Sequence, residues 1–521
     1  MHLLRTALLF VLSAIPVWGR APAGPWDAFN YAPKSKTVYP SAIHSFQGPV
    51  KNSQHLVHNA GGATISTRGS WVALDFGVEV GGLISLRFDS VTSTSAISLS
   101  FTESPSFIRP TASDDSSFPS ANTTYDGVLR VPAPLTAGFW TQPSSTLRGG
   151  FRFLTIVSDS DAPVTISNVS CAISFMPHVD DLRAYSGYFH AIDPVFHDAD
   201  FLTKVWYAGA YTVQTNTVPL NTGRKVPFAP AGTWANNATL GVAGPIIVDG
   251  GKARSRRMAR YEFSSLACLD DTHSTSTGDM GIAVPAQFVS TNDLIPTRNA
   301  LSTMFAAINP KTGALPESGP PLSQQGSDTY HAWTLIGTHN YYLFSGDTAW
   351  LQQAWTNYTK AVAFLEGKVD STGLINITGL RDWARLGGGG YNAEGNALLY
   401  KVLTTAADLA NYLNDTALAS AWSNNATALK AKFNDAFWLE SAGLYKDNQT
   451  TTLCPQDANS FAVLFNLTTS PAQANRISEG LQKNWNALGP VAPELPDTIS
   501  PFIGGFEVSR FSRKIPVGPR R

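Results

Sequence analysis

Residues 394–437 read EGNALLYKVLTTAADLANYLNDTALASAWSNNATALKAKFNDAF, and this stretch decides the fold of the larger part of the chain. In its first half, apolar side chains recur every three or four residues, as on one face of a helix: Leu399, Val402, Leu403, Ala406, Leu409 and Leu413. In its second half the pattern continues with Leu418, Trp422, Leu429 and Phe433. Only a few residues around Asn414 and Asp415 separate the halves, so the stretch predicts two antiparallel helices.

Helical spacing also extends to either side of this pair. It predicts a helix that includes Leu202, Val205 and Trp206, and further helices near 285–306, 331–345, 348–366 and 471–484. Glycine-rich loops alternate with these helices from about residue 195 to residue 509. Long helices joined by such loops predict a toroid of helical hairpins.

The region before the helices has the period of β-strands. Residues 71–76, 83–88, 97–101, 149–157 and 172–175 alternate between apolar and polar side chains, with Gly, Pro and Ser between the runs. Short alternating strands of this kind are typical of a β-sandwich. We therefore expect a β-sandwich domain at residues 20–190 and a helical domain at 195–509.

The composition limits the function classes. Charged residues make up only 14% of the 521 residues, and the formal net charge is -1. A chain with so little net charge lacks the excess positive charge that attracts nucleic acid or an anionic membrane. We expect neither as a partner.

The N-terminus predicts secretion. Residues 1–19 combine Arg5, a short apolar run from Ala7 to Val17, and a small residue, Gly19, at the expected cleavage site of a signal peptide. That run is too short to span a bilayer. The chain also carries nine Asn-x-Ser/Thr sequons: Asn122, Asn168, Asn237, Asn357, Asn376, Asn414, Asn425, Asn448 and Asn466. Together these features predict a secreted glycoprotein that is free of the membrane once the signal is removed.

Loops beside the predicted helices carry acidic and aromatic residues, which is the chemistry of a sugar site. Trp383 offers an apolar face to a sugar ring, and the neighbouring Asp382 offers a carboxylate to its hydroxyls. Trp333 and Glu394 stand at comparable places near other helices. Each residue also has an ordinary alternative, since a Trp can pack between helices and Glu394 can cap one. Their recurrence in successive loops favours a carbohydrate pocket lined by Trp333, Asp382, Trp383 and Glu394.

Other catalytic chemistries lack their motifs. His273, His331 and His339 do not have the spacing of metal ligands with Cys or Glu. The sequence has no Gly-x-Ser-x-Gly elbow and no nucleotide-binding glycine motif. Glycoside hydrolysis needs two carboxyl groups, and spacing alone does not pair the acids available here.

Five longer motifs carry a resemblance to a known family: VWYAGAY at 205–211, DGGK at 249–252, GDMG at 278–281, DTYHAWTLIG at 328–337 and GYNAEGN at 390–396. Across most of residues 60–508 the chain resembles the secreted α-L-rhamnosidases of glycoside hydrolase family 78. The resemblance implies an N-terminal accessory β-sandwich and an (α/α)6 six-hairpin catalytic domain. It also implies inverting hydrolysis of terminal α-L-rhamnosides in plant-type polysaccharides or glycosides, without a metal or other cofactor.

The first acidic motif departs from the family pattern. In similar proteins it is continuous, roughly Asp-Gly-Ala-Lys-Arg-Asp-Arg-x-x-Trp-x-Gly-Asp, with two outer acids that bind the sugar and a middle proton donor. Asp249 and Asp279 match the outer acids. The position of the middle acid, counted from Asp249, is occupied by Arg254, and Asp271 lies one residue out of register when counted back from Asp279. We assign Asp249, Asp271 and Asp279 as the candidate catalytic acids, interrupted by an atypical insertion at 253–277.

The C-terminal end departs as well. In the family the general base lies in a Trp-Glu motif beyond the position of Glu507. Here the family-like sequence stops near Ser509, and residues 510–521 form a basic tail. We expect a toroid that is incomplete at its C-terminal end and a chain that hydrolyses rhamnosides slowly or not at all. Another six-hairpin glycosidase and a non-catalytic sugar-binding relative remain the alternatives.

Overall fold

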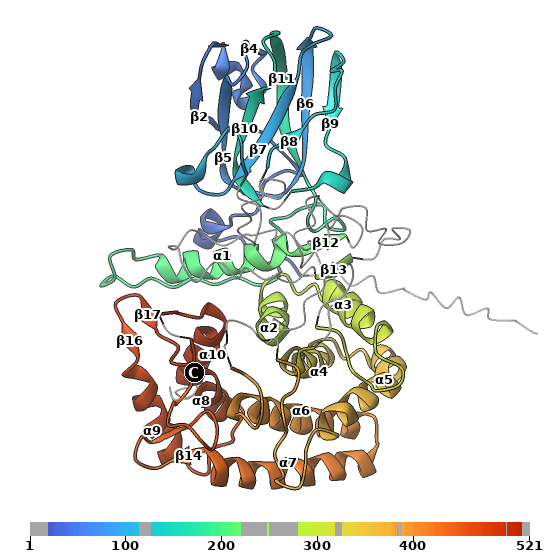
Figure 1. The fold of residues 1–521 in the computed structure, drawn as a ribbon, viewed down its shortest axis with the longest axis vertical. Helices are drawn as coiled ribbons and strands as arrows, with labels where there is room; N and C mark the ends of the chain where they lie inside the picture. The colour runs from blue at the N-terminus through green and yellow to red at the C-terminus, as the bar shows by residue number, and fades with distance from the viewer. Residues whose placement is uncertain are drawn as a thin grey trace, which may run out of the picture.

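The computed structural model describes residues 19–113, 127–148, 150–219, 247–249, 280–317, 326–380, 382, 385, 387–495 and 497–512. A β-sheet region and a helical region are stacked end to end, and helix α1 lies between them (Figure 1). The predicted signal peptide, the insertion at 253–277 and most of the basic tail lie outside the described residues.

The N-terminal region contains two antiparallel sheets. In one the strand order is β3-β4-β11-β6-β9, with β1 also paired to β11; in the other it is β2-β5-β10-β7-β8. Their bounds are β1 Thr37–Val38, β2 Ala42–Gln47, β3 Val50–Lys51, β4 Ala63–Ile65, β5 Trp71–Val80, β6 Gly82–Ser90, β7 Ile97–Thr102, β8 Leu129–Arg130, β9 Gly138–Thr141, β10 Phe151–Ser158 and β11 Val164–Ile173. Four 3-10 helices accompany them: η1 Pro25–Phe29, η2 Ser53–Asn59, η3 Pro105–Phe107 and η4 Ser144–Thr146.

The alternation seen in the sequence explains how the sheets pack. Leu154 on β10 lies opposite Leu74 on one side and Phe101 on the other. All three side chains are buried in one apolar core between the sheets. The polar side chains between them on β7 and β10, such as Ser100 and Thr155, are buried as well, so these two strands are covered on both faces.

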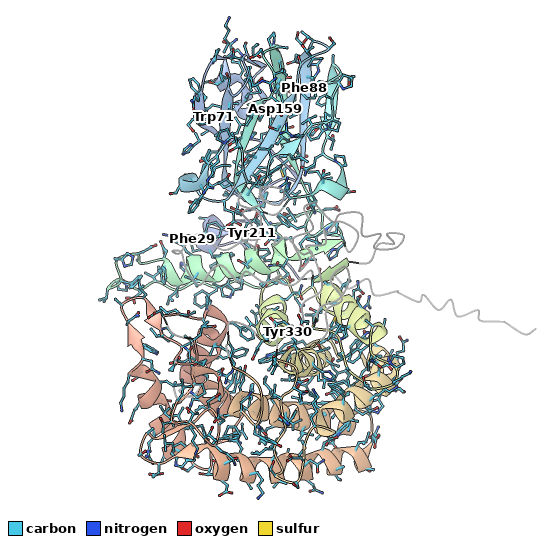
Figure 2. The ribbon with its side chains drawn as sticks, viewed as in Figure 1. Phe29, Trp71, Phe88, Asp159, Tyr211 and Tyr330 are labelled. Carbon is cyan, nitrogen blue, oxygen red and sulfur yellow. The ribbon has the colours of Figure 1, made fainter. Side chains whose placement is uncertain are left out.

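Helix α1 (Phe201–Thr215) connects the two regions. Tyr207 and Tyr211 pack with Phe175 and Tyr185 in a second, smaller core. The hydroxyl of Tyr211 donates to the carbonyl oxygen of Glu79 at 2.8 Å, which ties α1 to strand β5 (Figure 2). The short pair β12 (Thr217–Pro219) and β13 (Ile247–Asp249) follows α1.

The helical region alternates inner and outer helices. Helices α2, α4, α6, α8 and α10 contact one another in that order, while α3, α5, α7 and α9 lie outside them (Figure 1). The bounds are α2 Met280–Ser290, α3 Ile295–Ala306, α4 Asp328–Ser345, α5 Thr348–Glu366, α6 Ala393–Tyr412, α7 Thr416–Phe437, α8 Gln456–Leu464, α9 Pro471–Gln482 and α10 Pro501–Ser512. Two further hairpins are β14 Trp438–Leu439 with β15 Leu444–Tyr445, and β16 Trp485–Asn486 with β17 Gly489–Pro490.

The helix pair that decides the fold is confirmed. Helices α6 and α7 pack against each other, and Asn414 makes the turn with a left-handed φ of 61°. Asp415 then caps α7 by accepting from the backbone N–H of Leu418 at 3.1 Å. Asn tolerates this backbone conformation better than most residues, which explains the short connection.

The single helix predicted near 285–306 is wrong, because the structure has two helices there. Helix α2 ends at Ser290, and Asn292 turns the chain with a φ of 53°. Asp293 accepts from the backbone N–H of Ile295 at 3.2 Å, and Pro296 follows at the start of α3. Pro296 fits the first turn of α3, and the left-handed turn at Asn292 separates this helix from α2.

The multidomain β + α fold class is confirmed, with the sheets first and the alternating inner and outer helices after them. The predicted domain boundaries and the expected incomplete C-terminal end stay predictions. Within the described part of the chain, every helix is too short or too polar to cross a membrane.

Candidate active site at the ends of the inner helices

The N-terminal ends of three inner helices bring acidic residues together. Asp328 is the first residue of α4, Glu394 is in the first turn of α6 and Asp457 is in the first turn of α8. A carboxylate is favoured at this end of a helix because the unpaired backbone N–H groups carry partial positive charge. The sequence therefore places its acids where the inner helices begin.

Capping side chains fix these helix ends. Ser327 accepts from Tyr330 N–H at 3.1 Å at the start of α4, and Asn392 accepts from Gly395 N–H at 2.7 Å at the start of α6. Helix α8 is capped from a distance by Glu494. Its carboxylate accepts from the N–H groups of Gln456 and Asp457 at 2.8 and 3.1 Å. The acids of the site therefore lie on helix ends whose backbone is held by capping hydrogen bonds.

Arg385, on the loop between α5 and α6, lies at the centre of these acids. Its guanidinium forms ion pairs with Asp447 and Asp457, and its Nε lies 3.3 Å from Oε2 of Glu394. The side chain of Arg385 is only 2% exposed. An isolated charge in such a place would be very costly, so each group depends on the others. We call Arg385, Asp382, Glu394, Asp447 and Asp457 the Arg385 cluster.

Asp382 joins this cluster from the same loop. Thr329 on α4 donates to Oδ1 of Asp382 at 2.9 Å, and the nearby Asp382 carboxyl helps to raise the pKa of Glu394. Asp382 is half-buried, whereas Glu394 is 4% exposed. The structure therefore brings together two of the four residues predicted to bind sugar.

The electrostatics of the Arg385 cluster are dominated by burial. Burial raises the pKa of Glu394 well above its usual range; Asp382 and Asp457 add to the shift and Arg385 opposes it. Burial likewise raises the pKa of Asp457, to about 8, against the attraction of Arg385. Burial disfavours the charged form of Arg385, but the surrounding acids outweigh it and its pKa is raised. Burial therefore favours the protonated forms of Glu394 and Asp457.

A second ion pair anchors the loop that carries Asp382 and Arg385. Lys368 donates to Asp328 at 2.5 Å. Oδ2 of Asp328 accepts from the backbone N–H groups of Thr378 and Gly379, both at 2.9 Å. Asp328 thus joins the start of α4 to the segment leading into the site.

Trp333 lies one turn deeper on α4 and is 3% exposed. Its indole stacks on Phe506 at 5.2 Å between ring centroids and meets Phe461 and Phe502 edge-on. A Cβ on Gly281 would come within 2.3 Å of the same ring, so α2 also packs closely against it. These contacts are those of the core alternative considered for this Trp, and its sugar-binding role stays a prediction.

The remaining predicted residues fall at the limits of the described structure. Asp249 is the last residue of β13 and pairs in register with Thr217, but its side chain is not described. Asp271, Asp279 and Trp383 lie outside the described residues. The assignment of Asp249, Asp271 and Asp279 as catalytic acids therefore stays a prediction.

Sequence reasoning missed three members of the Arg385 cluster: Arg385 itself, Asp447 and Asp457. Asp447 and Asp457 follow Arg385 by 62 and 72 residues, so no local spacing links them. The available signal was an Arg three residues after Asp382 in a chain with few charges. Within the described residues, the structure has no group of three or more His, Cys, Asp or Glu side chains that could hold a metal ion.

Comparisons with known proteins identify a family that this helical region resembles. Residues 274–489 match the family described as the bacterial alpha-L-rhamnosidase 6 hairpin glycosidase domain. No curated protein sequence matches the chain.

Three solved structures share the fold. A rhamnosidase from Klebsiella oxytoca with rhamnose bound is 14% identical, with a TM-score of 0.62 over 94% of this chain and 85% of its own. A family 78 rhamnosidase from a Bacillus species is 16% identical, with a TM-score of 0.60 over 86% of this chain and 40% of its own. The α-L-rhamnosidase of Aspergillus terreus is 15% identical, with a TM-score of 0.54 over 90% and 46%.

The match over residues 274–489 spans α2 to α9, the helices whose ends carry the Arg385 cluster. The solved structures share the sheets and the helical region together. The predicted resemblance is confirmed: residues 274–489 match the six-hairpin glycosidase domain described for bacterial alpha-L-rhamnosidases, and the chain shares the fold of solved rhamnosidase structures.

Proposed function

We propose that this chain acts on terminal α-L-rhamnosides and cleaves them with inversion at the anomeric carbon. The observation that carries the proposal is the acid-rich Arg385 cluster at the ends of the inner helices, in a domain that matches the rhamnosidase family. Asp382, the half-buried acid of the cluster, is suited to accept hydrogen bonds from sugar hydroxyls. The rhamnose bound in the Klebsiella structure supports the choice of sugar.

An inverting glycosidase needs a carboxylic acid that protonates the leaving oxygen and a carboxylate that activates water. In this proposal Asp249, Asp271 and Asp279 supply the acid side of the site, as the motif match implies. Residues 253–277 separate Asp249 from Asp279 in a motif that is continuous in similar proteins. Displacing a positioned proton donor costs about 10²–10⁴-fold in rate, so we expect slow turnover from this chain.

The test is hydrolysis of an aryl α-L-rhamnoside followed by proton NMR. Release of β-L-rhamnose as the first product supports inversion, and α-L-rhamnose as the first product contradicts it. A variant in which the continuous motif replaces residues 253–277 should be faster than the chain itself. Equal rates would overturn the role given to the insertion, and release of a different sugar from other glycosides would indicate another six-hairpin specificity.

A non-catalytic sugar-binding role is the second candidate. The observation that favours it is that Glu394 and Asp457 are engaged with Arg385 rather than standing apart as an acid and a base. Such a protein would bind L-rhamnose without turnover. Calorimetric binding together with no product release, in both the chain and the variant with the continuous motif, would select this candidate.

We also propose that the protein is secreted and N-glycosylated, on the basis of its signal-like N-terminus and nine sequons. Expression in a eukaryotic secretory host should give a mature chain that begins near Arg20. Its mobility should increase after glycan removal. An intact Met1 and unchanged mobility would contradict this proposal.

A further inference from the structure

The start of α4 holds the backbone of the loop between α5 and α6. Ser327, the residue before the helix, pairs with Leu380 in a short antiparallel bridge. Oδ2 of Asp328 accepts from the backbone N–H groups of Thr378 and Gly379, both at 2.9 Å. Two successive residues of α4 and its cap therefore fix the path of this loop as it approaches the Arg385 cluster.

Thr329, the next residue of α4, contacts a side chain of the loop instead of its backbone. Its hydroxyl donates to Oδ1 of Asp382 at 2.9 Å, and Thr329 itself is only 3% exposed. The backbone of the loop is held by other contacts. Loss of the Thr329 hydroxyl should therefore loosen the carboxyl of Asp382 without releasing the loop.

The N-cap of α4 sets the direction of the Thr329 hydroxyl. Oγ of Ser327 accepts from the N–H of Tyr330 at 3.1 Å and lies 3.2 Å from Oγ1 of Thr329. A hydroxyl has a single hydrogen, and that of Thr329 is directed to Asp382. Ser327 is therefore the donor to Thr329, and the two hydroxyls form a chain that ends on Asp382.

We propose that Thr329 is a positioning residue, whose hydroxyl holds the carboxyl of Asp382 in the orientation that accepts a hydrogen bond from a sugar hydroxyl. This inference rests on the proposed function, in which Asp382 touches the sugar. Thr329 acts only through Asp382. An acceptor oxygen of a carboxyl has two lone pairs, so the bond from Thr329 leaves Oδ1 able to accept a second donor.

The effect on binding comes from ordering Asp382 before the sugar arrives. Asp382 is half-buried, so its side chain is only partly confined by packing, and the bond from Thr329 adds a directional restraint. A side chain that becomes ordered only on binding loses its rotational freedom at that moment, which weakens affinity by about two- to tenfold. This is the loss expected when the Thr329 hydroxyl is removed.

The experiment measures the affinity of the full chain for L-rhamnose by calorimetry in wild type, Thr329→Val and Thr329→Ser. Val keeps the shape of Thr and removes the hydroxyl, so this variant should bind about two- to tenfold more weakly. Ser restores the hydroxyl on a smaller side chain and should recover most of the lost affinity. A role in packing alone would not be rescued by Ser.

A double-mutant cycle tests whether Thr329 acts through Asp382. Asp382→Ala removes the carboxyl that Thr329 holds and should itself weaken binding. In that chain Thr329→Val should cause no further loss, because residues that act through one contact have effects that do not add. Ligand-observed NMR at millimolar L-rhamnose measures the weak binding of these two variants.

Thr334→Val provides the matched control. Thr334 is fully buried on the same helix, and its hydroxyl donates to the carbonyl oxygen of Tyr330 at 3.1 Å, within α4. Its variant should be less stable than wild type in urea unfolding but bind L-rhamnose with the same affinity. Circular dichroism of all variants should match wild type, which separates loss of orientation from loss of fold.

Three results would overturn the inference: a Thr329→Val chain that binds as tightly as wild type, a Thr329→Ser chain that binds as weakly as the Val variant, or an equal loss from Thr329→Val with and without Asp382→Ala. If wild type binds no L-rhamnose, the proposed function fails, and the same cycle measured by urea unfolding judges the hold on Asp382. Coupled effects on the free energy of unfolding would support that hold, and strictly additive effects would exclude it.

Discussion

Helix α4 begins in a charged site and continues into an apolar core within little more than one turn. Its first residues, Asp328 and Thr329, bond to Lys368 and Asp382. Trp333 on the same helix is surrounded by the rings of Phe461, Phe502 and Phe506. Both ends of this short segment are buried, yet different forces hold them.

The difference teaches which residues can change without loss of the fold. In the core, stability depends on volume and contact, so any truncation leaves a cavity. In the Arg385 cluster, stability depends on the balance of charges, so the effect of a change depends on pH. Substitutions in the two regions should therefore differ in how their effect on stability depends on pH.

Trp333→Ala should produce the largest effect, a loss of about 3–5 kcal/mol in the free energy of unfolding. The substitution empties a space between α2, α4, α8 and α10, and packed rings cannot close it fully. Because no charge is involved, the loss should be the same at pH 5 and pH 8. Urea unfolding measures it, with Phe139→Ala as control, since Phe139 is 69% exposed on β9. A loss that varied with pH would contradict a purely packing role.

Arg385→Met should cost about 3 kcal/mol at pH 7, because it leaves the acids of the cluster without their cation. In contrast to Trp333→Ala, the loss should grow as the pH rises toward 8, because Asp457, whose pKa is raised to about 8, then ionises without its cation. Thermal unfolding from pH 4 to pH 8 would follow this change. Arg476→Met removes an exposed ion pair with Glu440 and should have a much smaller effect. Equal losses for the two arginines would show that burial of the cluster does not matter.

Asp457→Asn should change the pH dependence of stability more than stability itself. Burial raises the pKa of Asp457 from 3.8 to about 8, so its contribution is complete below about pH 4 and is lost on the way to about pH 8. Asn does not titrate, so the variant should gain on wild type as pH rises through this window. Melting temperatures at pH 4.5, 6 and 8 test the sign. If the melting temperatures of the variant and of wild type changed with pH in parallel, Asp457 would not ionise in this pH range.

The same contrast explains what the sequence could predict. The pair α6–α7 was predicted to within a residue or so because its apolar side chains repeat at helical spacing and Asn414 makes a short turn. Helices α8 and α10 were missed. Buried polar residues such as Asn459 and Ser460 conceal the period of α8, and two adjacent glycines at 504 and 505 make α10 resemble a loop.

The candidate site was only partly predictable. Asp382 and Glu394 could be chosen because acids beside aromatic residues favour a sugar site, and the structure places both of them around Arg385. Arg385 could not be chosen, because its role depends on Asp447 and Asp457, which only the packing of α6 against α8 brings near. Charge compensation of this kind is a property of the folded arrangement and leaves no spacing in the chain.

Thr329→Val should have the smallest effect, about 1 kcal/mol of unfolding free energy, because it removes one hydrogen bond and keeps the shape of the side chain. Thr329 is 3% exposed, and its hydroxyl donates to Asp382 at 2.9 Å. Urea unfolding measures the loss, with Thr334→Val on the same helix as the comparison, since Thr334 donates only to a backbone carbonyl. A Thr329→Val chain as stable as wild type would show that the hydrogen bond to Asp382 contributes nothing to the stability of the Arg385 cluster.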